Sequence, residues 1–490
     1  MTAFVRPGLS RRQWLAGAAA LGASSLLPRA VLAATPSPLL TVATRTIEVK
    51  KRAATVFGIL GANGKPGLEA SEGARLSGLV HNATKEPLIL HFHGQVLYAN
   101  DQDRARTGGG ETAPGALEPV DFPLTTGTHW MHSHLLSEQQ LLAAPLITRE
   151  MDAPAIREVV IMLHDFAFRS PAEIMAELGG ASAHGAHGAA ADPHAGHAGH
   201  GAPAAAPADP HAAHMAGAMS GMVHANDVRY DAFLANDRSF DDPEVVRVDK
   251  GEKVRLRIIN GATATAFILD TGRLAATCIA VDGSPCQAHA VQTLPLAQGQ
   301  RVDLVVEIPR DGGAFPIVAQ VEAATQRTGI VLATAGAKVA RIGNDASRAA
   351  AHADLGFDLG LAAAAPLPPP SAPARAIHIM LGEEPGYRWT LNGKTHGEHT
   401  PLAAKSGERL EIMFMNPTSM MHPMHLHGHH FQVVEVNGLR FSGPVRDTVI
   451  VPPRTMVTVA VDAGAPGSWY LHCHHLYHMA TGMMTELVVS

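Results

Sequence analysis

Four short histidine motifs stand out in the sequence, each with two imidazoles separated by one residue. They are His91-Phe92-His93, His132-Ser133-His134, His425-Leu426-His427 and His472-Cys473-His474. In a β-strand, residues i and i+2 point to the same face, so each motif would present two imidazoles side by side. A single motif of this kind is weak evidence in a chain with 29 histidines. Together, however, eight imidazoles from four strands could enclose a cluster of metal ions.

The last of these motifs also carries a thiol, and its surroundings are more specific. A strand through His472, Cys473 and His474 would direct the thiolate to one face and both imidazoles to the other. Two further histidines and a methionine stand where they could complete a site around this thiolate. These residues are His422, His478 and Met483. Two histidines, one cysteine and a weak methionine are the ligands of a blue electron-transfer copper, and Cys473 would link it covalently to the neighbouring imidazoles.

The elements that must position these side chains are predicted to be β-strands. Short runs rich in Val, Ile and Leu recur along the chain between Gly, Pro, Asn and Asp residues. Such spacing is typical of all-β sandwiches, and a length of 490 residues suits several domains. We therefore predict three β domains, at 39–150, 151–335 and 372–490.

Two shifts in composition interrupt this pattern. Residues 172–226 are rich in Ala, Gly and Pro and loaded with His and Met, which predicts a disordered insert in the second domain. Residues 336–371 end in a Pro/Ala stretch that is typical of a linker. Imidazoles and thioethers in a mobile chain bind copper weakly, so the insert is interpreted either as a copper-gathering segment or as a spacer.

The N-terminal residues 1–33 are predicted to be a targeting segment that is removed from the mature protein. Arg11 and Arg12 precede an apolar run, and Val31-Leu32-Ala33 offers a small-residue cleavage site. This arrangement is similar to a twin-arginine export signal, and an ordinary secretory signal is the alternative. The apolar run is too short for a membrane span, so we expect an exported protein without one. The formal net charge of -6 and the lack of a basic stripe speak against nucleic-acid binding.

The three cysteines of the chain fall into two groups. Cys473 has the ligand role described above. Cys278 and Cys286 flank a predicted turn at Asp282-Gly283 and could form a disulfide. Pairing across this turn would not place them directly opposite each other, so a disulfide and two free thiols both stay open.

The four motifs, in this order, resemble the four copper-binding segments of the multicopper oxidases, a family that includes laccases, bacterial cuprous oxidases and copper-resistance oxidases. The resemblance spans nearly the whole chain after the export segment, and every expected ligand is present. It implies three cupredoxin-like Greek-key β-sandwich domains, with a trinuclear copper cluster between the first and the third. It also implies an enzyme with four copper ions, which couples one-electron oxidation of a reductant to four-electron reduction of O2 to water.

The family pattern assigns the copper ligands by position. The type 1 copper would be held by His422, Cys473, His478 and Met483. The type 2 copper would be held by His91 and His425. One type 3 copper would be held by His93, His132 and His474, and the other by His134, His427 and His472. Cys473 and its neighbours His472 and His474 would relay electrons from the type 1 copper to the other three.

Proton delivery and the reductant are separate questions. Family members often place an acidic residue shortly after the first motif, and Asp101 or Asp103 would take this role here, with a solvated loop acid as the alternative. The reductant is predicted to be Cu(I) or another metal ion, in periplasmic copper tolerance, or else a phenolic compound. A binding protein that sequesters copper on the insert is the alternative from a different class. We expect a monomer, with O2 as the second substrate.

Overall fold

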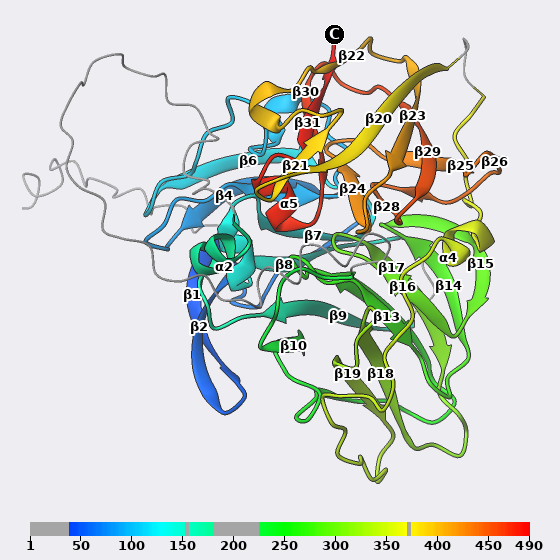
Figure 1. Ribbon diagram of the computed structural model, residues 1–490. Helices are drawn as coiled ribbons and strands as arrows, with labels where there is room; N and C mark the ends of the chain where they lie inside the picture. The colour runs from blue at the N-terminus through cyan, green and yellow to red at the C-terminus, as the bar shows by residue number, and fades with distance from the viewer. Residues whose placement is uncertain (1–38, 152–155, 180–224, 370–373) are drawn as a thin grey trace, which may run out of the picture. The chain divides into compact units, whose positions relative to one another are not determined.

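In the part of the chain that the structure describes, β-strands dominate the fold and assemble into six sheets (Figure 1). The computed structural model describes residues 39–151, 156–179, 225–369 and 374–490. Strands such as β1 (Leu40–Val49) alternate buried and more exposed side chains, because one face of the sheet packs against a second sheet. The sheets follow one another along the chain in three pairs, and the two sheets of each pair lie inside one of the three predicted domain segments. The prediction of an all-β fold is confirmed.

The first pair of sheets holds the first two histidine motifs. One sheet has the order β2 (Arg52–Gly61), β1, β4 (Arg75–Asn82) and β6 (Leu117–Pro123). The other has the order β3 (Leu68–Ser71), β8 (Ala143–Arg149), β7 (Gly127–Ser133) and β5 (Leu90–His93).

The second pair of sheets carries none of the four motifs. Its larger sheet has the order β10 (Ala232–Ala235), β9 (Arg157–Phe166), β12 (Lys253–Asn260), β17 (Arg301–Glu307), β14 (Ala276–Val281) and β15 (Ser284–Val291). Its smaller sheet has the order β11 (Val245–Arg247), β19 (Arg327–Ala333), β18 (Ala314–Val321), β13 (Phe267–Asp270) and β16 (Thr293–Leu296).

The third pair of sheets holds the last two motifs. One sheet has the order β21 (Arg388–Leu391), β20 (Arg375–Glu384), β23 (Arg409–Asn416), β29 (Thr455–Asp462), β25 (Phe431–Val436) and β26 (Leu439–Arg440), with β27 (Val445–Arg446) paired to β25. The other has the order β22 (Leu402–Ala404), β31 (Met484–Val489), β30 (Gly467–Cys473), β24 (His422–Leu426) and β28 (Thr448–Val451).

Two large apolar cores fill these sandwiches. One buried cluster runs through both the first and the third pair of sheets and includes Phe122, Phe414 and Trp469. The second pair encloses a core of its own around residues such as Phe267 and Leu304. Burial of apolar side chains is the dominant stabilising contribution in such layers. The shared core holds the first and third sandwiches against each other, which brings motifs from the two ends of the chain into one region.

The helices are short and lie between the strands. Within the described ranges they are η2 (Asn100–Gln102), η3 (Leu136–Gln140), α2 (Pro171–Glu177), α4 (Gly356–Gly360), η4 (His396–Glu398) and α5 (Leu476–Ala480). Among the residues that the structure describes, none of the helices has the length and apolar character needed to cross a membrane. The predicted export segment 1–33 lies outside the described residues and stays a prediction.

The predicted insert 172–226 begins with ordered structure. Its first residues belong to helix α2, where the Ser170 hydroxyl accepts a hydrogen bond from the Glu173 backbone and the Glu173 carboxylate accepts one from the Ser170 backbone. The prediction of disorder is therefore wrong for this stretch, because Ser-Pro-Ala-Glu is a capping box that the low-complexity composition around it obscured. Residues 180–224, with most of the histidines and methionines of the insert, lie outside the described residues.

The predicted linker 336–371 connects the second and third pairs of sheets. Residues 336–352 are exposed or half-buried, and the segment packs against the sheets from Ala353 onward. Phe357 and Leu361, in and next to helix α4, belong to the core of the second pair of sheets. Asp358 of the same helix accepts a hydrogen bond from Arg446 in the third pair. The segment is therefore an anchored connector and not a free spacer, because one turn of helix supplies the apolar anchors that its Pro/Ala composition lacks.

Candidate metal centre

Strand pairing brings the four histidine motifs together. β5 pairs with β7 so that His91 lies opposite His132, and β24 pairs with β30 so that His425 lies opposite His472. Eight imidazoles meet where the first and third sandwiches pack, and all are buried. This eight-imidazole cluster consists of His91, His93, His132, His134, His425, His427, His472 and His474. The same pairing places Cys473 opposite Met424, on the other face of the sheet from His472.

On that other face, three side chains form what we call the three-ligand pocket. It consists of His422, Cys473 and His478, and all three are fully buried. The Cys473 Sγ lies 3.7 Å from the Nδ1 of each histidine, and the two Nδ1 atoms are 3.3 Å apart. Donor atoms that share one ion lie roughly 3 to 4 Å apart, since each metal–ligand bond is about 2.0–2.3 Å long. The three donors therefore fit a single soft ion such as copper.

The surroundings of the three-ligand pocket leave its donor atoms available. The outer Nε2 of His422 contacts the Thr418 hydroxyl at 2.9 Å, and the outer Nε2 of His478 faces Asp227 at 3.4 Å. Burial lowers the pKa of His422 far below its usual range and that of His478 to about 3, so both imidazoles are neutral, as metal ligands must be. Met483 is fully buried beside them, and its backbone oxygen accepts a hydrogen bond from the Cys473 N–H.

Inward-facing nitrogens of the eight-imidazole cluster approach one another closely. The Nε2 of His472 lies 3.3 Å from that of His134 and 3.0 Å from that of His427. The Nε2 atoms of His91 and His425 are 3.4 Å apart. The first three of these histidines are the set predicted for one type 3 copper and the last two are the set predicted for the type 2 copper, but His91 and His425 also lie within reach of His427, so the assignment stays a prediction. Neutral imidazoles that point nitrogen at nitrogen are natural ligands of a cation between them.

The remaining predicted set contains buried nitrogens with no hydrogen-bond partner. In the described ranges, nothing bonds to the Nδ1 of His93, the Nε2 of His132 or either ring nitrogen of His474. A buried polar atom without a partner costs roughly 1–3 kcal/mol, and such atoms call for an explanation. Together with the nitrogen contacts, they fit a donor set for copper ions.

The outer ring nitrogens of the cluster are held by carboxylates and backbone oxygens. The Nδ1–H groups of His91 and His427 donate to the two oxygens of Asp103 at 3.2 and 2.8 Å. Burial raises the pKa of Asp103, but the two imidazoles outweigh burial and hold it well below its usual range. Asp103 is thus an ionised acceptor that fixes both rings. Asp101 is exposed on η2, so of the two aspartates predicted as alternatives only Asp103 contacts the cluster.

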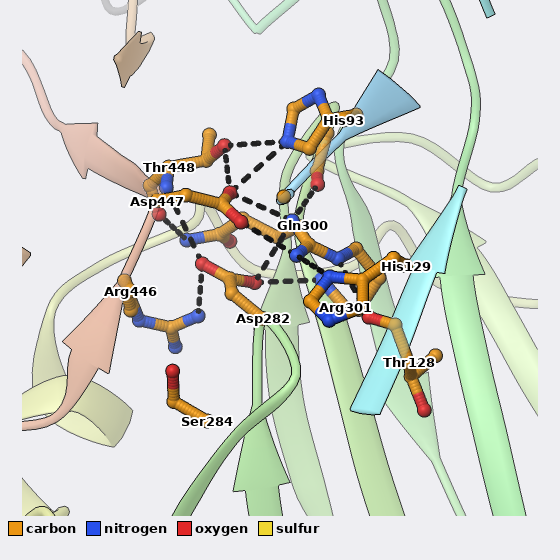
Figure 2. A network of polar contacts seen from close by, with 12 residues as sticks. His93, Thr128, His129, Asp282, Ser284, Gln300, Arg301, Arg446, Asp447 and Thr448 are labelled. Atoms are coloured by element: carbon orange, nitrogen blue, oxygen red, sulfur yellow. Dashed lines mark hydrogen bonds and ion pairs between the residues drawn. The ribbon is translucent and has the colours of Figure 1, made fainter. Parts of the chain in front are cut away.

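His93 is held the other way round, with its Nε2–H pointing outward. This group lies 3.0 Å from an Asp447 oxygen and 3.2 Å from the Thr448 hydroxyl, which leaves Nδ1 facing the cluster. Arg301 donates to both oxygens of Asp447, at 2.7 and 2.6 Å (Figure 2). Arg301 belongs to β17, so the second sandwich supports the cluster without contributing an imidazole to it.

The same polar network continues away from the cluster. Asp282 accepts a hydrogen bond from the Arg301 backbone at 2.8 Å and lies 3.3 Å from Arg446, as Figure 2 shows. Arg301, Arg446, Asp282 and Asp447 are each at most 2% exposed. Two positive and two negative charges balance one another, which is the condition for burying ions at tolerable cost.

Sequence reasoning missed the groups around His478. Asp227, 18% exposed at its side chain, accepts hydrogen bonds from His475 at 3.1 Å and from the Tyr387 hydroxyl, besides facing His478. The Trp389 ring stacks on His478 with centroids 3.8 Å apart. No local motif marks Asp227, because it follows the low-complexity stretch and lies far from His478 in sequence.

A cavity of about 450 Å³ lies beside helix α5. Its mostly apolar lining includes Tyr387, His396 and Met479, and at one side His134 of the cluster. Met479 follows His478 directly, so the cavity approaches both the three-ligand pocket and the eight-imidazole cluster.

Fold and site together define a class of protein. A simple electron carrier needs only the three-ligand pocket. A second metal-binding cluster joined to it by one strand is characteristic of a copper-dependent oxidoreductase. Multicopper oxidase family models match residues 41–150, 192–341 and 368–490. The chain belongs to the multicopper oxidase family, and its three sandwiches are cupredoxin-like, as predicted.

Individual relatives cover most of the chain. It is 29% identical to multicopper oxidase MmcO of Mycobacterium tuberculosis over 86% of this chain and 81% of that protein. It is 26% identical to a copper resistance protein A homolog of Pseudomonas syringae, over 92% of each. Among solved structures, a multicopper oxidase from Pseudomonas thermotolerans superposes with a TM-score of 0.67 at 21% identity, covering 92% of this chain and 98% of that one.

Proposed function

We propose that this enzyme oxidises a small reductant one electron at a time and reduces O2 by four electrons to water. Four copper ions would be held by the ligands that the family pattern assigns: His422, Cys473, His478 and Met483 for type 1, His91 and His425 for type 2, and His93, His132, His474 with His134, His427, His472 for type 3. When bound, copper supplies one-electron transfer at the three-ligand pocket and O2 binding and reduction at the cluster.

The observation that carries this proposal is the alternation along one strand. Cys473 faces the three-ligand pocket, while its neighbours His472 and His474 face the eight-imidazole cluster. The two sites are therefore joined by a few covalent bonds, and no mobile carrier is needed between them. Burial of every ligand excludes water from this path, which limits side reactions of partly reduced oxygen.

The residues around the ligands supply orientation. Asp103 fixes His91 and His427, so that each presents Nε2 inward. Asp447 and Thr448 fix His93, so that it presents Nδ1. Ligand imidazoles are commonly held through the second nitrogen in this way, and the contact determines both the tautomer and the ring plane. Asp103 is thus better suited to orient ligands than to deliver protons, the role predicted from the sequence.

For the reductant, Cu(I) or another metal ion in periplasmic copper tolerance is the stronger candidate, and a phenol is the second. A curated relative that matches 92% of the chain is named for copper resistance. Asp227 provides a partly exposed carboxylate next to His478, where a cation or a phenolic hydroxyl would be attracted. The mostly apolar cavity beside α5 favours a small organic reductant instead.

Copper loading tests the central proposal. The mature chain would be loaded with Cu(I) under low oxygen, exposed to air, and examined by visible spectroscopy while bound copper is counted. An intense blue band with about four coppers per chain is expected from one type 1 site and one trinuclear cluster. A colourless protein with loosely bound copper would contradict the proposal and favour the sequestering alternative.

A deletion separates the substrates. Residues 180–224, which lie outside the described residues, would be removed and the rates of Cu(I) and phenol oxidation compared. Loss of Cu(I) oxidation with phenol oxidation intact is expected if the insert gathers copper for the type 1 site. Unchanged rates with both substrates would contradict a copper-gathering role of the insert.

A further inference from the structure

Two thiols that the copper chemistry does not use lie side by side in the second sandwich. The Sγ atoms of Cys278 in β14 and Cys286 in β15 are 3.7 Å apart, and no bond joins them. Both side chains face the apolar core, with exposures of 0% and 7%. Contact of two sulfurs that are eight residues apart in sequence is not imposed by a simple hairpin, so the local backbone must create it.

A bulge in the β14–β15 ladder creates this contact. Cys278 pairs with His289, whereas Ala280 pairs with Pro285, so that Ile279 alone faces the stretch from Cys286 to Ala288. The prediction that the cysteines could not lie directly opposite each other in a regular hairpin is correct. The pairing of β14 with β17 is irregular at the same place, and both cysteines are buried in the apolar core of the second pair of sheets.

The bulge has a structural partner. Cys286 forms an isolated β-bridge with Ala363 of the connector, and the Gln287 N–H donates to the Ala362 oxygen at 2.8 Å. The Ala363 N–H in turn donates to the Gly443 oxygen of the third sandwich at 3.2 Å. The cysteine pair therefore lies under the point where the connector joins the second and third sandwiches.

The two thiols are not equivalent. Cys278 is fully buried and contacts the Ala280 backbone oxygen at 3.6 Å, whereas Cys286 keeps some exposure. The hydrogen bond from Cys278 lowers the pKa of Cys286, and the nearby Arg446 guanidinium lowers it further. The same pairing raises the pKa of Cys278. Because Cys286 lies nearer the surface, an external disulfide reaches its sulfur first, and the fully buried Cys278 is placed to resolve the mixed disulfide.

We propose that Cys278 and Cys286 form a dithiol–disulfide couple. Its disulfide cross-links β14 and β15 at the bulge beneath the connector. The oxidant is a disulfide of low molecular weight. The Cys286 thiolate attacks one of its sulfurs and expels one thiol, which leaves a mixed disulfide on Cys286. Cys278 then attacks the Cys286 sulfur and expels the second thiol. Two electrons and two protons pass from the cysteine pair to the oxidant, and the sulfurs move from contact to bonding distance, about 2.0 Å.

Thiol counting on the whole protein tests this couple. The purified chain would be equilibrated in glutathione buffers of increasing oxidation, stripped of copper in denaturant and alkylated, and its mass measured. Because the chain has three cysteines, the reduced form takes three alkyl groups and the oxidised form takes one, on Cys473. Three alkyl groups at every buffer composition would overturn the proposal. Native mass spectra that show copper on the pair in place of a disulfide would also overturn it.

Two single variants test the order of attack. Cys278→Ala should accumulate glutathione on Cys286, because the resolving thiol is absent, whereas Cys286→Ala should take up none on Cys278. Both variants keep Cys473, so an unchanged blue band shows that each is folded and holds type 1 copper. Equal glutathione uptake by the two variants would contradict the assigned roles. Oxidation of the wild-type chain should raise its Tm by about 5 °C, as expected for closing a short loop.

Discussion

The three-ligand pocket and the eight-imidazole cluster share strand β30 but are assembled in different ways. His422, Cys473 and His478 all come from the third sandwich, where the paired strands β24 and β30 and the adjoining helix α5 hold them together. The cluster takes half its imidazoles from the first sandwich and half from the third, and it is braced by a charge network from the second. One site is thus a property of a single fold, whereas the other is a property of an assembly.

This difference indicates where each site is vulnerable. Changes that disturb the packing between sandwiches should affect the cluster first, because its ligands are held together only while the sandwiches stay in contact. The three-ligand pocket should survive such changes, since its ligands are close in the third sandwich. The blue band reports on copper in the three-ligand pocket, and the number of bound coppers reports on the cluster as well. The two sites can therefore be followed separately in the same molecule.

Cys473→Ser should have the largest effect, because it should abolish copper binding in the three-ligand pocket and leave the cluster intact. A hydroxyl is a poor ligand for copper compared with a thiolate, so the blue band should vanish and oxidase activity should fall to the level of the copper-free chain. The eight imidazoles are untouched, and about three coppers should remain bound. Visible spectra, O2 consumption and copper analysis measure these outcomes. Turnover retained in the variant would refute the relay through Cys473.

Asp447→Asn should weaken copper binding by the eight-imidazole cluster and leave the three-ligand pocket unchanged. The substitution leaves Arg301 buried without its carboxylate partner, which is expected to cost about 3–5 kcal/mol of stability, and it weakens the hold on His93. Copper bound by the cluster should fall while the blue band persists. The matched control is Asp303→Asn, which removes a buried carboxylate from Arg255 and Arg257 away from the imidazoles. The control should lose stability and keep its copper; equal copper loss in both variants would contradict the positioning role.

Asp227→Asn tests the three-ligand pocket through its contact with the second sandwich. The carboxylate faces His478 from the second sandwich, so the pocket has one interdomain contact of its own. Removing its charge should lower kcat/KM about 10- to 100-fold, the usual effect of losing such a contact, while the blue band stays. Tyr387→Phe removes only a hydroxyl that donates to Asp227 and should have a smaller effect. Steady-state kinetics and the reduction potential of the blue copper would measure both, and unchanged values in Asp227→Asn would remove it from the electron-entry site.

The sequence predicted a set of ligands but not the residues that orient them, for a physical reason. Side-chain alternation is a local rule, so the sequence alone assigns His472 and His474 to one face of a strand and Cys473 to the other. The contacts that orient the ligands depend on how sandwiches pack. Arg301 and Asp227 come from a sandwich that carries no motif, and nothing near them in the chain indicates their partners.

The same reasoning explains the ordered start of the insert. Helix α2 follows from a local capping signal that could have been recognised, since Ser170 and Glu173 have the spacing of a capping box. The bulge at Cys286 could not, because it depends on the connector that pairs with it. Local geometry was accessible from the sequence, whereas contacts between distant segments were not.

Contacts between the sandwiches should also be more sensitive to acid than the three-ligand pocket. Substitution of His129 tests this and has the smallest expected effect. Its Nδ1 accepts a hydrogen bond from Arg301 at 3.2 Å, and its Nε2–H donates to the Thr126 oxygen. Burial, reinforced by Arg301 and His430, lowers the pKa of His129 from 6.5 to about 3, although Asp447 opposes the shift.

The sign of the pH effect follows from this depressed pKa. Below pH 6.5 this imidazole binds a proton in the unfolded chain, whereas in the folded chain it stays neutral down to about pH 3. Stability therefore falls with decreasing pH in this window, by about 1.4 kcal/mol per pH unit for this group. His129→Gln can keep both hydrogen bonds without titrating, so unfolding of the copper-free protein should depend less steeply on pH between 6 and 4. An equally steep pH dependence in His129→Gln and the wild-type protein would show that His129 does not couple the interface to pH.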